Sequence, residues 1–351
     1  MEVDAAIIGG GVVGLACASA LARAGKTTVV LEKFRTLGSV TTSRNSEVIH
    51  AGLYYAPGSL KATTCVRGAA LLYAWCAERQ VPHARCGKLV VATSDVELGA
   101  LDALAARAKE NGATVELVGR DRIAELEPNV RAIAALHSPS TGIVSSHALA
   151  LSLAADVESH GGILAKARRV VAAEPAADRW KLACEGPAGD ETVTAARVVN
   201  AAGLWADEIA SLFGVTLAQR FMKGSYFHVK RAVTRALVYP LPPADGSLGI
   251  HTTVDLAGAV RLGPDAEPAR SREDYGVDES RRSVFFEAAS RYLQNLRIDD
   301  LTPDCAGIRP KHASGDFELR AERGVVHLAG IESPGLTAAL ALGERVAMLL
   351  S

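Results

Sequence analysis

Three glycines near the start of the chain have the spacing that holds a pyrophosphate. Gly9, Gly11 and Gly14 form the pattern Gly-x-Gly-x-x-Gly. The first glycine allows a sharp turn, the second lets the backbone approach the phosphates, and the third permits close helix–strand packing. Glu32 can accept hydrogen bonds from both hydroxyls of an adenosine ribose, and its charge disfavours the 2′-phosphate of NADP. These residue types predict a dinucleotide site.

The surrounding sequence predicts the βαβ unit that such glycines need. An apolar run over residues 3–8 predicts a buried strand, and residues 13–24 place small and apolar side chains at helical spacing. Gly25 ends this helix, and residues 27–31 predict a second strand that leads into Glu32. The N-terminus of the helix would offer N–H groups and the positive end of its dipole to the phosphates. The motif alone leaves NAD and FAD open.

Composition limits the class of protein. The 351 residues suggest two domains, and 49% of them are hydrophobic. The formal net charge of −1 without a basic block makes nucleic acid an unexpected partner. The six cysteines are scattered, which predicts reduced thiols in a cytoplasmic protein and no metal site. The predicted fold begins almost at Met1, so neither a signal peptide nor a membrane-spanning helix is expected.

A strand, a glycine turn and a helix follow one another at three places, around Gly9, Gly203 and Gly335. An alternating, β-rich run over residues 222–262 lies between the second and third, and residues 163–174 and 180–185 predict paired strands. This order predicts a discontinuous nucleotide domain with an antiparallel substrate domain inserted into it. The expected ranges are 1–85, 145–215 and 300–351 for the nucleotide domain, and 86–144 and 216–299 for the substrate domain.

A second motif identifies a family. Arg44-Asn45-Ser46, followed by Val-Ile-His-Ala-Gly-Leu-Tyr-Tyr over residues 48–55, resembles the D-amino-acid-oxidase-like FAD oxidoreductases, and most of all their L-2-hydroxyglutarate oxidase/dehydrogenase group. That group usually has Thr-Gly-His-Asn-Ser-Gly where this chain has Thr-Ser-Arg-Asn-Ser-Glu over residues 42–47. It typically ends in a stretch like Asn-Ala-Pro-Ser-Pro-Ala-Ala, whereas this chain has residues 330–337. These departures concern the substrate more than the flavin.

The resemblance implies an α/β fold with a Rossmann-like FAD-binding domain of the glutathione-reductase type and an α+β second domain. Three glycine turns suit the long FAD molecule, whereas NAD alone would leave the middle and final turns without a role. The glycine motif and the resemblance together place the following residues against FAD: Gly9, Gly11, Val13, Gly14, Glu32, Lys33, Ser43, Arg44, Asn45, Ser46, Val170, Ala202, Gly203, Trp205, Gly307, Ile308, Gly330, Ile331, Gly335, Leu336 and Thr337. Cys305 is the candidate for a covalent flavin link.

Histidines and an arginine are the candidate catalytic residues of such an oxidase. His50 is the first candidate for the general base, because an imidazole titrates near neutral pH, although a structural role is equally compatible with its position. His251 is the second candidate, whereas His327 is expected at the surface or a strand end. Arg309 could bind a substrate carboxylate through two parallel hydrogen bonds. Lys311, Tyr55 and Tyr226 are further candidates for substrate contact, while Lys61 is expected in a salt bridge.

The resemblance implies oxidation of a small 2-hydroxy acid, with L-2-hydroxyglutarate the leading candidate, by hydride transfer to flavin N5. The expected electron acceptor is oxygen, a quinone or an electron-transfer protein. A deaminating oxidase of amino acids or secondary amines is the first alternative, and it would need no dedicated base. A flavoprotein subunit without its own turnover is the second alternative, but it would not require His50, His251 and Arg309 together.

Overall fold

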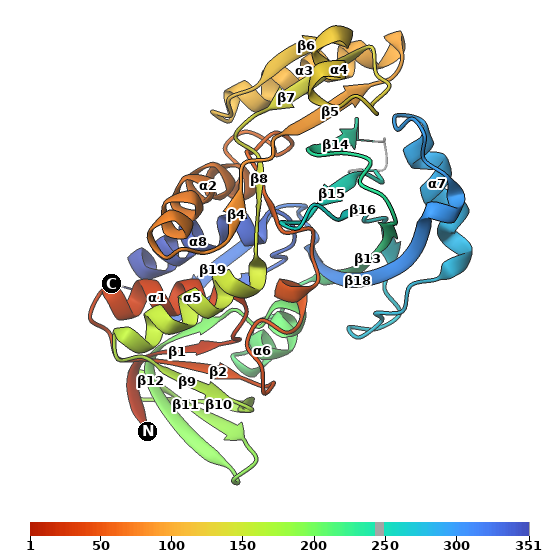
Figure 1. The fold of residues 1–351 in the computed structure, drawn as a ribbon. Coiled ribbons are helices and arrows are strands. Elements are labelled where there is room, and N and C mark those ends of the chain that lie inside the picture. The colour runs from red at the N-terminus through yellow and green to blue at the C-terminus, as the bar shows by residue number, and fades with distance from the viewer. Residues whose placement is uncertain (243–248, 351) are drawn as a thin grey trace.

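In the computed structural model, which describes residues 1–242 and 249–350, an eight-stranded sheet forms the base of one half of the molecule (Figure 1). Parallel strands run in the order β9, β2, β1, β12 and β20. Strand β11 pairs antiparallel with residues 191–195 of β12, and β10 pairs antiparallel with β11. Strand β19 pairs antiparallel with β20. The strands are β1 (Glu2–Ile8), β2 (Thr28–Glu32), β9 (Ile163–Lys166), β10 (Arg169–Ala176), β11 (Arg179–Glu185), β12 (Glu191–Asn200), β19 (Glu318–Glu322) and β20 (Val325–Ala329).

Helices cover one face of this sheet. Helix α1 (Val12–Arg23) packs between α5 (Ser146–Ser159) and α8 (Gly335–Leu349), and α2 (Leu60–Glu78) packs on α8 (Figure 1). A further helix, α6 (Ala206–Leu212), contacts β10, β12 and β20. The small side chains of α1 let it lie close to the sheet, so its buried residues share cores with β1, β2 and α8.

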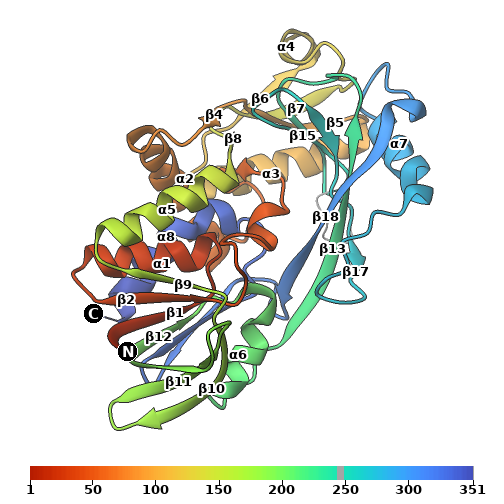
Figure 2. The ribbon, with the colours of Figure 1, turned by 60° about the horizontal axis from the view of Figure 1, so that its bottom comes forward.

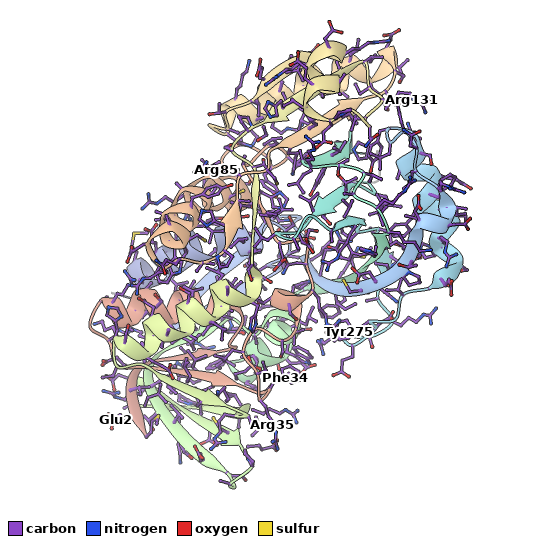
Figure 3. All side chains as sticks on the ribbon, in the orientation of Figure 1. Glu2, Phe34, Arg35, Arg85, Arg131 and Tyr275 are labelled. Carbon is purple, nitrogen blue, oxygen red and sulfur yellow. The ribbon has the colours of Figure 1, made fainter. Side chains whose placement is uncertain are left out.

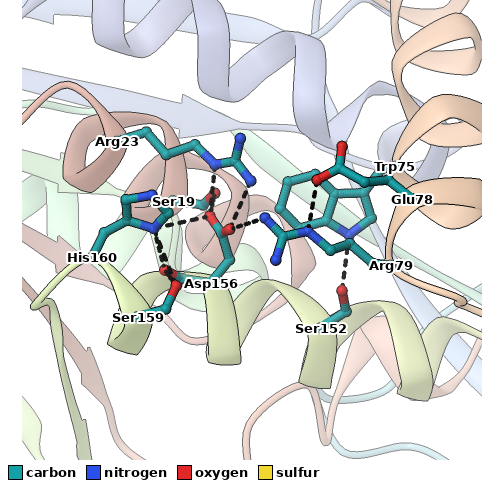
Figure 4. Close-up of polar contacts among 9 residues, drawn as sticks. All are labelled: Ser19, Arg23, Trp75, Glu78, Arg79, Ser152, Asp156, Ser159 and His160. Atoms are coloured by element: carbon teal, nitrogen blue, oxygen red, sulfur yellow. Dashed lines mark hydrogen bonds and ion pairs between the residues drawn. The ribbon is translucent and has the colours of Figure 1, made fainter.

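A buried carboxylate ties three of these helices together. Asp156 on α5 accepts hydrogen bonds from Ser19 Oγ at 2.6 Å, from Arg23 Nη2 at 2.7 Å and from Arg79 Nη2 at 2.8 Å (Figure 4). Its side chain is fully buried, so α1 and the end of α2 are both anchored to α5 at this point. A buried charge needs such partners, because a carboxylate without them would be costly in the interior.

The second half of the molecule contains smaller sheets. Among the described residues, an antiparallel five-stranded sheet comprises β13 (Gln219–Val229), β15 (Thr252–Val254), β16 (Val260–Leu262), β17 (Glu267–Pro268) and β18 (Leu301–His312). A second sheet has the described strands β14 (Leu237–Pro240), β5 (Lys88–Ala92), β7 (Ala134–Ser138) and β6 (Glu116–Gly119). One hydrophobic core joins these two sheets, and the long strands β13 and β18 run side by side toward the helical half (Figure 2).

The remaining elements connect these parts. A small sheet consists, within the described residues, of β3 (Val48–Ile49), β8 (Gly142–Val144) and β4 (His83–Ala84). The other helices are α3 (Leu98–Glu110), α4 (Arg120–Leu126) and α7 (Arg282–Ser290). Short 3₁₀ helices are η1 (Thr41–Ser43), η2 (Asp95–Glu97), η3 (Gly203–Trp205), η4 (Glu279–Arg281) and η5 (Ile298–Asp300).

The α/β class and the βαβ unit predicted from the sequence are confirmed. One predicted strand is wrong, because residues 163–174 form two strands separated by Ala167, which has φ of 55°. The first strand, β9, extends the parallel sheet, while β10 turns into a hairpin. The expectation for His327 is also wrong, since it is 0% exposed in β20, where its ring lies against Asn200. Residues 243–248 of the predicted β-rich run lie outside the described residues.

Strand β18 carries two prolines, which obscured it in the sequence. Pro303 and Pro310 cannot donate to a ladder, but β18 pairs only with β13 among the described strands, and an edge strand tolerates proline. This strand falls in the range 300–351 assigned above to the nucleotide domain, yet its ladder partner β13 belongs to the range assigned to the substrate domain.

The structure also shows the state of the cysteines, the grouping of metal-ligating side chains and the character of the helices. All six cysteines are free thiols. No group of metal-ligating side chains gathers in the residues that are described. Across residues 1–242 and 249–350, no helix has both the length and the apolar character needed to cross a bilayer.

Candidate functional site

A large cavity lies where the helical half meets the five-stranded sheet. Its volume is about 580 Å³, and its wall is built from residues far apart in the sequence. The three glycine turns of Gly9, Gly203 and Gly335 all contribute to this one wall. Strands β13 and β18 contribute Gly224 and Gly307, which pair in register. The cavity is therefore shared by the nucleotide sheet and the β-rich sheet.

The first glycine motif behaves as its spacing predicts. Gly11 faces open space, since a Cβ placed there would meet only Thr42 Oγ1, at 3.3 Å. A Cβ on Gly14 would collide with the backbone oxygen of Gly9, so Gly14 is required by packing. The hydroxyl Thr42 Oγ1 also accepts a hydrogen bond from Val12 N at 3.1 Å, at the first residue of α1. This leaves a cradle of backbone into which a pyrophosphate fits.

Glu32 closes the same end of the cavity. Its Oε2 accepts from Gly10 N at 2.7 Å and its Oε1 from Phe34 N at 2.8 Å, so the carboxylate is fixed in orientation. Burial raises the pKa of Glu32 above its ordinary value, against the effect of these two hydrogen bonds. Each oxygen keeps further acceptor capacity, as a ribose diol would require.

Aromatic and cationic side chains lie next to Glu32. Lys33 Nζ lies 3.0 Å from the centroid of the Trp205 ring, and Phe34 meets the same ring edge-on at 5.9 Å. Figure 3 labels Phe34 and Arg35 on the segment that follows β2. Arg168 and Arg169, which the sequence did not single out, also line the cavity. These groups suit an adenosine diphosphate with a negative pyrophosphate.

The opposite end of the cavity lies at the N-terminus of α8. Gly335 and Leu336 line it, whereas Thr337 acts in packing. Thr337 Oγ1 accepts from His50 N at 3.0 Å and donates to Val48 O at 3.1 Å. This hydroxyl therefore fixes the segment that carries His50 against α8.

Gly224 and Gly307, which pair in register, form the floor of the cavity at its α8 end. A Cβ on Gly307 would collide with the backbone oxygen of Arg44, so the segment with the second motif rests directly on β18. The Arg44 guanidinium lies 4.2 Å from the centroid of the Tyr275 ring. Tyr275, which Figure 3 labels, lies on the loop after β17. On the neighbouring strand, Tyr226 Oη lies 2.8 Å from Ser46 Oγ. A flat apolar ring system fits such a floor.

Arg309 projects into the cavity from β18. Its Nη2 donates to the backbone oxygen of Asp265 at 2.7 Å, while its buried Nε has no hydrogen-bond partner among the described residues. The Asp265 carboxylate is itself held by Ser225 N at 2.7 Å and by Arg281 Nε at 2.8 Å. The guanidinium is thus fixed at Nη2, and Nη1 has no hydrogen-bond partner among the described residues, so the charge of Arg309 is available to an anion in the cavity.

His251 is buried, being 2% exposed, and lines the cavity. Its Nδ1 lies 2.7 Å from Gly249 O, and a carbonyl can only accept, so the proton is on Nδ1 and the lone pair is on Nε2. Burial lowers the pKa of His251 to about 3, and the positive charges of Lys88 and Arg309 act in the same direction. His251 is therefore a neutral imidazole with its tautomer fixed.

His50 is the second histidine of the cavity wall. Its Nε2 lies 3.2 Å from Ser333 Oγ, on the loop that leads into α8. Burial lowers the pKa of His50 well below its ordinary value, and the positive charge of Lys88 acts in the same direction. Both candidate bases are thus present and neutral.

Most of the residues expected at the site meet in this cavity. Those lining it are His50, His251, Arg309, Tyr226, Gly9, Gly11, Val13, Glu32, Lys33, Arg44, Asn45, Ser46, Val170, Ala202, Gly203, Trp205, Gly307, Ile331, Gly335 and Leu336. The described wall does not include Tyr55, Lys311, Gly14, Ser43, Ile308, Gly330, Thr337 or Cys305.

The absent residues have other roles in the structure. The backbone oxygen of Tyr55 accepts from Asn111 Nδ2 at 2.9 Å, and Ser43 Oγ donates to Val40 O at 3.0 Å. Ile308 is 1% exposed and belongs to the core of the molecule. The salt bridge expected for Lys61 is confirmed, with Nζ 2.9 Å from Glu332 Oε1.

The sequence missed several cavity residues. Tyr239 and Asp265 both line the cavity. Tyr239 precedes Pro240 and Asp265 follows Pro264 in β-rich sequence, and neither residue has a motif of its own. Thr42 and Ser333 were closer to recognition, because each stands beside a motif that had been singled out. A search for hydroxyl side chains next to the glycine turns would have found Ser333, two residues before Gly335, whereas Thr42 stands next to the second motif.

Known proteins provide an independent comparison. L-2-hydroxyglutarate dehydrogenases are similar to this chain, including the mitochondrial enzyme of Arabidopsis thaliana at 35% identity over 99% of this chain and 83% of the relative. The mitochondrial enzyme of Homo sapiens is 32% identical over 98% of this chain and 88% of its own length. The enzyme of Salmonella houtenae is 30% identical over 98% of this chain and 92% of its own length.

Solved structures share the fold. L-alpha-glycerophosphate oxidase from Mycoplasma pneumoniae, with FAD bound, superposes with a TM-score of 0.92 at 24% identity, covering 100% of this chain and 95% of that one. Glycine oxidase from Geobacillus kaustophilus has a TM-score of 0.86 at 23% identity, covering 99% and 94%. The sequence model of the DAO family, described as FAD dependent oxidoreductase, matches residues 4–349. The chain therefore belongs to the DAO family of FAD-dependent oxidoreductases, and it is an enzyme whose cofactor is FAD.

Proposed function

We propose that this enzyme oxidises L-2-hydroxyglutarate to 2-oxoglutarate. The proposal is supported by relatives named L-2-hydroxyglutarate dehydrogenase at 30% to 35% identity over almost the whole chain. One structural observation carries it: Arg309, held at Nη2 by Asp265 O, lines the same cavity as His251, whose Nε2 holds a lone pair. A carboxylate site beside a proton acceptor is what oxidation of a 2-hydroxy acid requires.

Arg309 binds the carboxylate next to the reacting carbon. Its contact with Asp265 O fixes the plane of the guanidinium before substrate arrives, which reduces the entropy lost on binding. A planar guanidinium matches a carboxylate with two parallel hydrogen bonds, so it also sets the orientation of the substrate. The hydroxyl on the adjacent carbon is then confined to the neighbourhood of the carboxylate.

His251 accepts the hydroxyl proton at Nε2. Among the charges that influence its pKa are those of Lys88 and Arg309, whereas the influences on His50 come from Lys88 and His251. The charge of Arg309 acts on His251, so a carboxylate bound to Arg309 would also act on that imidazole. That negative charge offsets the positive charges and raises the proton affinity of the imidazole when it is needed.

FAD, when bound, would supply the acceptor for the hydride released from the substrate carbon. The residues that would hold it are the cavity-lining glycines 9, 11, 203 and 335 with Glu32. The N-terminus of α8 supplies N–H groups and a positive dipole end, which favour negative charge on the reduced cofactor.

The domain boundaries and cellular setting complete the proposal. Residues 1–85, 145–215 and 313–351 would form an FAD domain of the glutathione-reductase type, and residues 86–144 and 216–312 the substrate domain, because β18 pairs with β13. A cytoplasmic location is proposed, although the plant and human relatives are named as mitochondrial. Oxygen, a quinone or an electron-transfer protein would take the electrons.

Anaerobic bleaching of the flavin tests this function. The purified enzyme is mixed without oxygen with L-2-hydroxyglutarate, and loss of the visible flavin band is followed in a stopped-flow instrument. D-2-hydroxyglutarate and L-lactate are the matched controls for configuration and for the second carboxylate, and both should reduce the flavin much more slowly. Bleaching by sarcosine or glycine, but by no hydroxy acid, would establish the alternative of an amine oxidase.

A further inference from the structure

A lysine is buried beneath the substrate end of the cavity. Lys88, the first residue of β5, is 1% exposed. Its Nζ lies 3.9 Å from the centroid of the Tyr239 ring and 5.4 Å from that of Tyr54. Within the described residues, Lys88 makes no ion pair with an aspartate or glutamate. A buried ammonium held mainly by aromatic rings is uncommon, because burying a charge is costly without a counter-ion.

The ring that contacts Lys88 also contacts the proposed base. Tyr239 and His251 are stacked, with centroids 3.6 Å apart and 18° between the ring planes. Lys88, Tyr239 and His251 therefore form a continuous column from the interior of the four-stranded sheet to the wall of the cavity. No contact in the mechanism described above explains why the interior end of this column carries a charge.

Strand pairing and a hydrogen bond hold the segments that carry Lys88, Tyr239 and His251. Strand β14 pairs with β5 in parallel, with Leu237 opposite Lys88 and Tyr239 opposite Val90, so Tyr239 and Lys88 lie on the same face of the sheet. Thr252 Oγ1 accepts from Val238 N at 2.8 Å, so the residue after His251 is bonded to the residue before Tyr239. The stack is thus fixed by backbone pairing as well as by ring contact.

We propose that Lys88 is a positioning residue: its ammonium, held against the Tyr239 ring, orients the stacked His251 and disfavours its protonation in the free enzyme, so that Nε2 still carries its lone pair when the substrate arrives. This inference rests on the proposed function only in taking His251 as the proton acceptor. The charge of Lys88 opposes a second positive charge on the imidazole, and the buried setting weakens that repulsion less than water would. A methionine would fill the same space without this effect.

The order of protonation agrees with this role. Burial lowers the pKa of Lys88 to about 7, while the pKa of His251 is about 3. As the pH falls, Lys88 gains its proton first and His251 remains neutral over the interval between the two values. The titratable or charged groups near this pair are Cys65 of α2, Cys86, His50, Tyr54, Tyr239, Tyr292 and Arg309.

The test follows the His251 imidazole directly by NMR. The FAD-bound enzyme is labelled with ¹³Cε1-histidine, and the His251 signal is assigned by its loss in His251→Asn. In Lys88→Met the titration midpoint of His251 should rise by about one pH unit, as expected for loss of a nearby charge at an effective dielectric constant of about 20. In the pH profile of kcat/KM, the midpoint of the decline at acidic pH should also rise, by about one pH unit.

Matched variants separate charge from packing. Lys88→Arg keeps the charge and should retain the wild-type midpoint, and Tyr239→Phe keeps the ring and should do the same. Lys26→Met removes an exposed lysine and controls for net charge. An unchanged His251 midpoint in Lys88→Met that binds FAD at wild-type stoichiometry would overturn the proposal.

A measurement on the wild-type enzyme covers the case in which Lys88→Met does not fold. Because Lys88 titrates near pH 7, the ¹³Cε1 signal of His251 should show a small step there, well above the midpoint of its own protonation. A flat signal through that range would contradict the proposal. Neither NMR result depends on the substrate, so failure here is distinct from failure of L-2-hydroxyglutarate to bleach the flavin.

Discussion

The guanidinium of Arg309 is held by the backbone of Asp265, with 2.7 Å between Nη2 and the carbonyl oxygen. This contact fixes the guanidinium at the cavity wall, where its charge can attract a carboxylate. The Asp265 side chain is in turn bonded to Ser225 and Arg281, so three chain segments fix the position of one cation.

Arg309→Gln should therefore lower kcat/KM for the 2-hydroxy acid by roughly 100-fold or more, about 3 kcal/mol, because a charge-assisted hydrogen bond in a buried site is lost. Steady-state kinetics and the ratio of flavin to protein check this result. Lys311→Gln is the matched control two residues along β18, since Lys311 is not among the described residues of the cavity wall, and it should change kcat/KM by less than a factor of about three. Equal losses in both variants would contradict the assignment of Arg309.

The two histidines should differ in their effect on kcat. His251→Asn removes the fixed Nε2 lone pair and should lower kcat by a factor of roughly 10² to 10⁴, the usual contribution of a general base. His50→Asn removes a ring bonded to Ser333 and should have a smaller effect. Rapid-mixing measurements of flavin reduction under saturating substrate compare the two. The reverse ranking would make His50 the proton acceptor, and small effects in both would favour amine oxidation.

The pH dependence of substrate oxidation follows from the state of His251. Its pKa is lowered to about 3, so the imidazole is neutral above that value and protonated only below it. The rate of flavin reduction should consequently not decline because of His251 between pH 8 and pH 5, whereas an unperturbed imidazole would lose activity near pH ~6.5. A stopped-flow pH profile at constant ionic strength measures this, and a decline centred near pH 6.5 that disappears in His251→Asn would oppose the interpretation.

Two glycines of the first motif should respond differently to alanine. Gly11 has extended backbone, and a Cβ there would meet only the Thr42 hydroxyl, at 3.3 Å, so Gly11→Ala should fold with a small local shift but bind FAD at least about tenfold more weakly, because the methyl group occupies the place of the phosphate backbone contact. Gly14→Ala should instead destabilise the apoprotein, since its Cβ meets the Gly9 carbonyl. Flavin titration and thermal unfolding distinguish the two effects. Normal FAD affinity in Gly11→Ala would place the pyrophosphate elsewhere.

Asp156 should make a large contribution to stability (Figure 4). Burial acts to raise its pKa, but hydrogen bonds from Arg23 and Ser19 outweigh that effect, so the pKa of Asp156 lies below its ordinary value. A depressed native pKa stabilises the fold above the unfolded pKa, near pH ~4, and that stability is lost as the pH falls through the native pKa. Asp156→Asn should lower the free energy of unfolding by about 3 kcal/mol at neutral pH.

Urea unfolding at pH 7 and at a pH below ~4 measures this contribution. Glu344→Gln is the control, because its ion pair with Arg67 is exposed and should contribute less than about 1 kcal/mol. If Asp156→Asn and Glu344→Gln were equally mild, the cluster would not anchor the helices.

The sequence was sufficient for features that depend on neighbouring residues. The strand, glycine turn and helix around Gly9 form within a short stretch, so periodicity and the conformational needs of glycine define them locally. The same reasoning found the turns at Gly203 and Gly335, and with them a long dinucleotide. Strand β18 was missed because Pro303 and Pro310 disguise an edge strand, and an edge exists only once a sheet has formed.

The surroundings of side chains were decided only by the tertiary structure. Tyr55 and Lys311 stand beside strong motifs, yet the described cavity wall does not include them, whereas Tyr239 and Asp265 belong to it without any motif. Lys88 begins a strand, where a lysine commonly faces water, but Tyr54 and Tyr239 from two other segments lie against it, and His251 stacks on Tyr239. Local sequence sets the conformation of the chain, while burial and the pKa shifts that follow from it depend on segments that meet only when the molecule has folded.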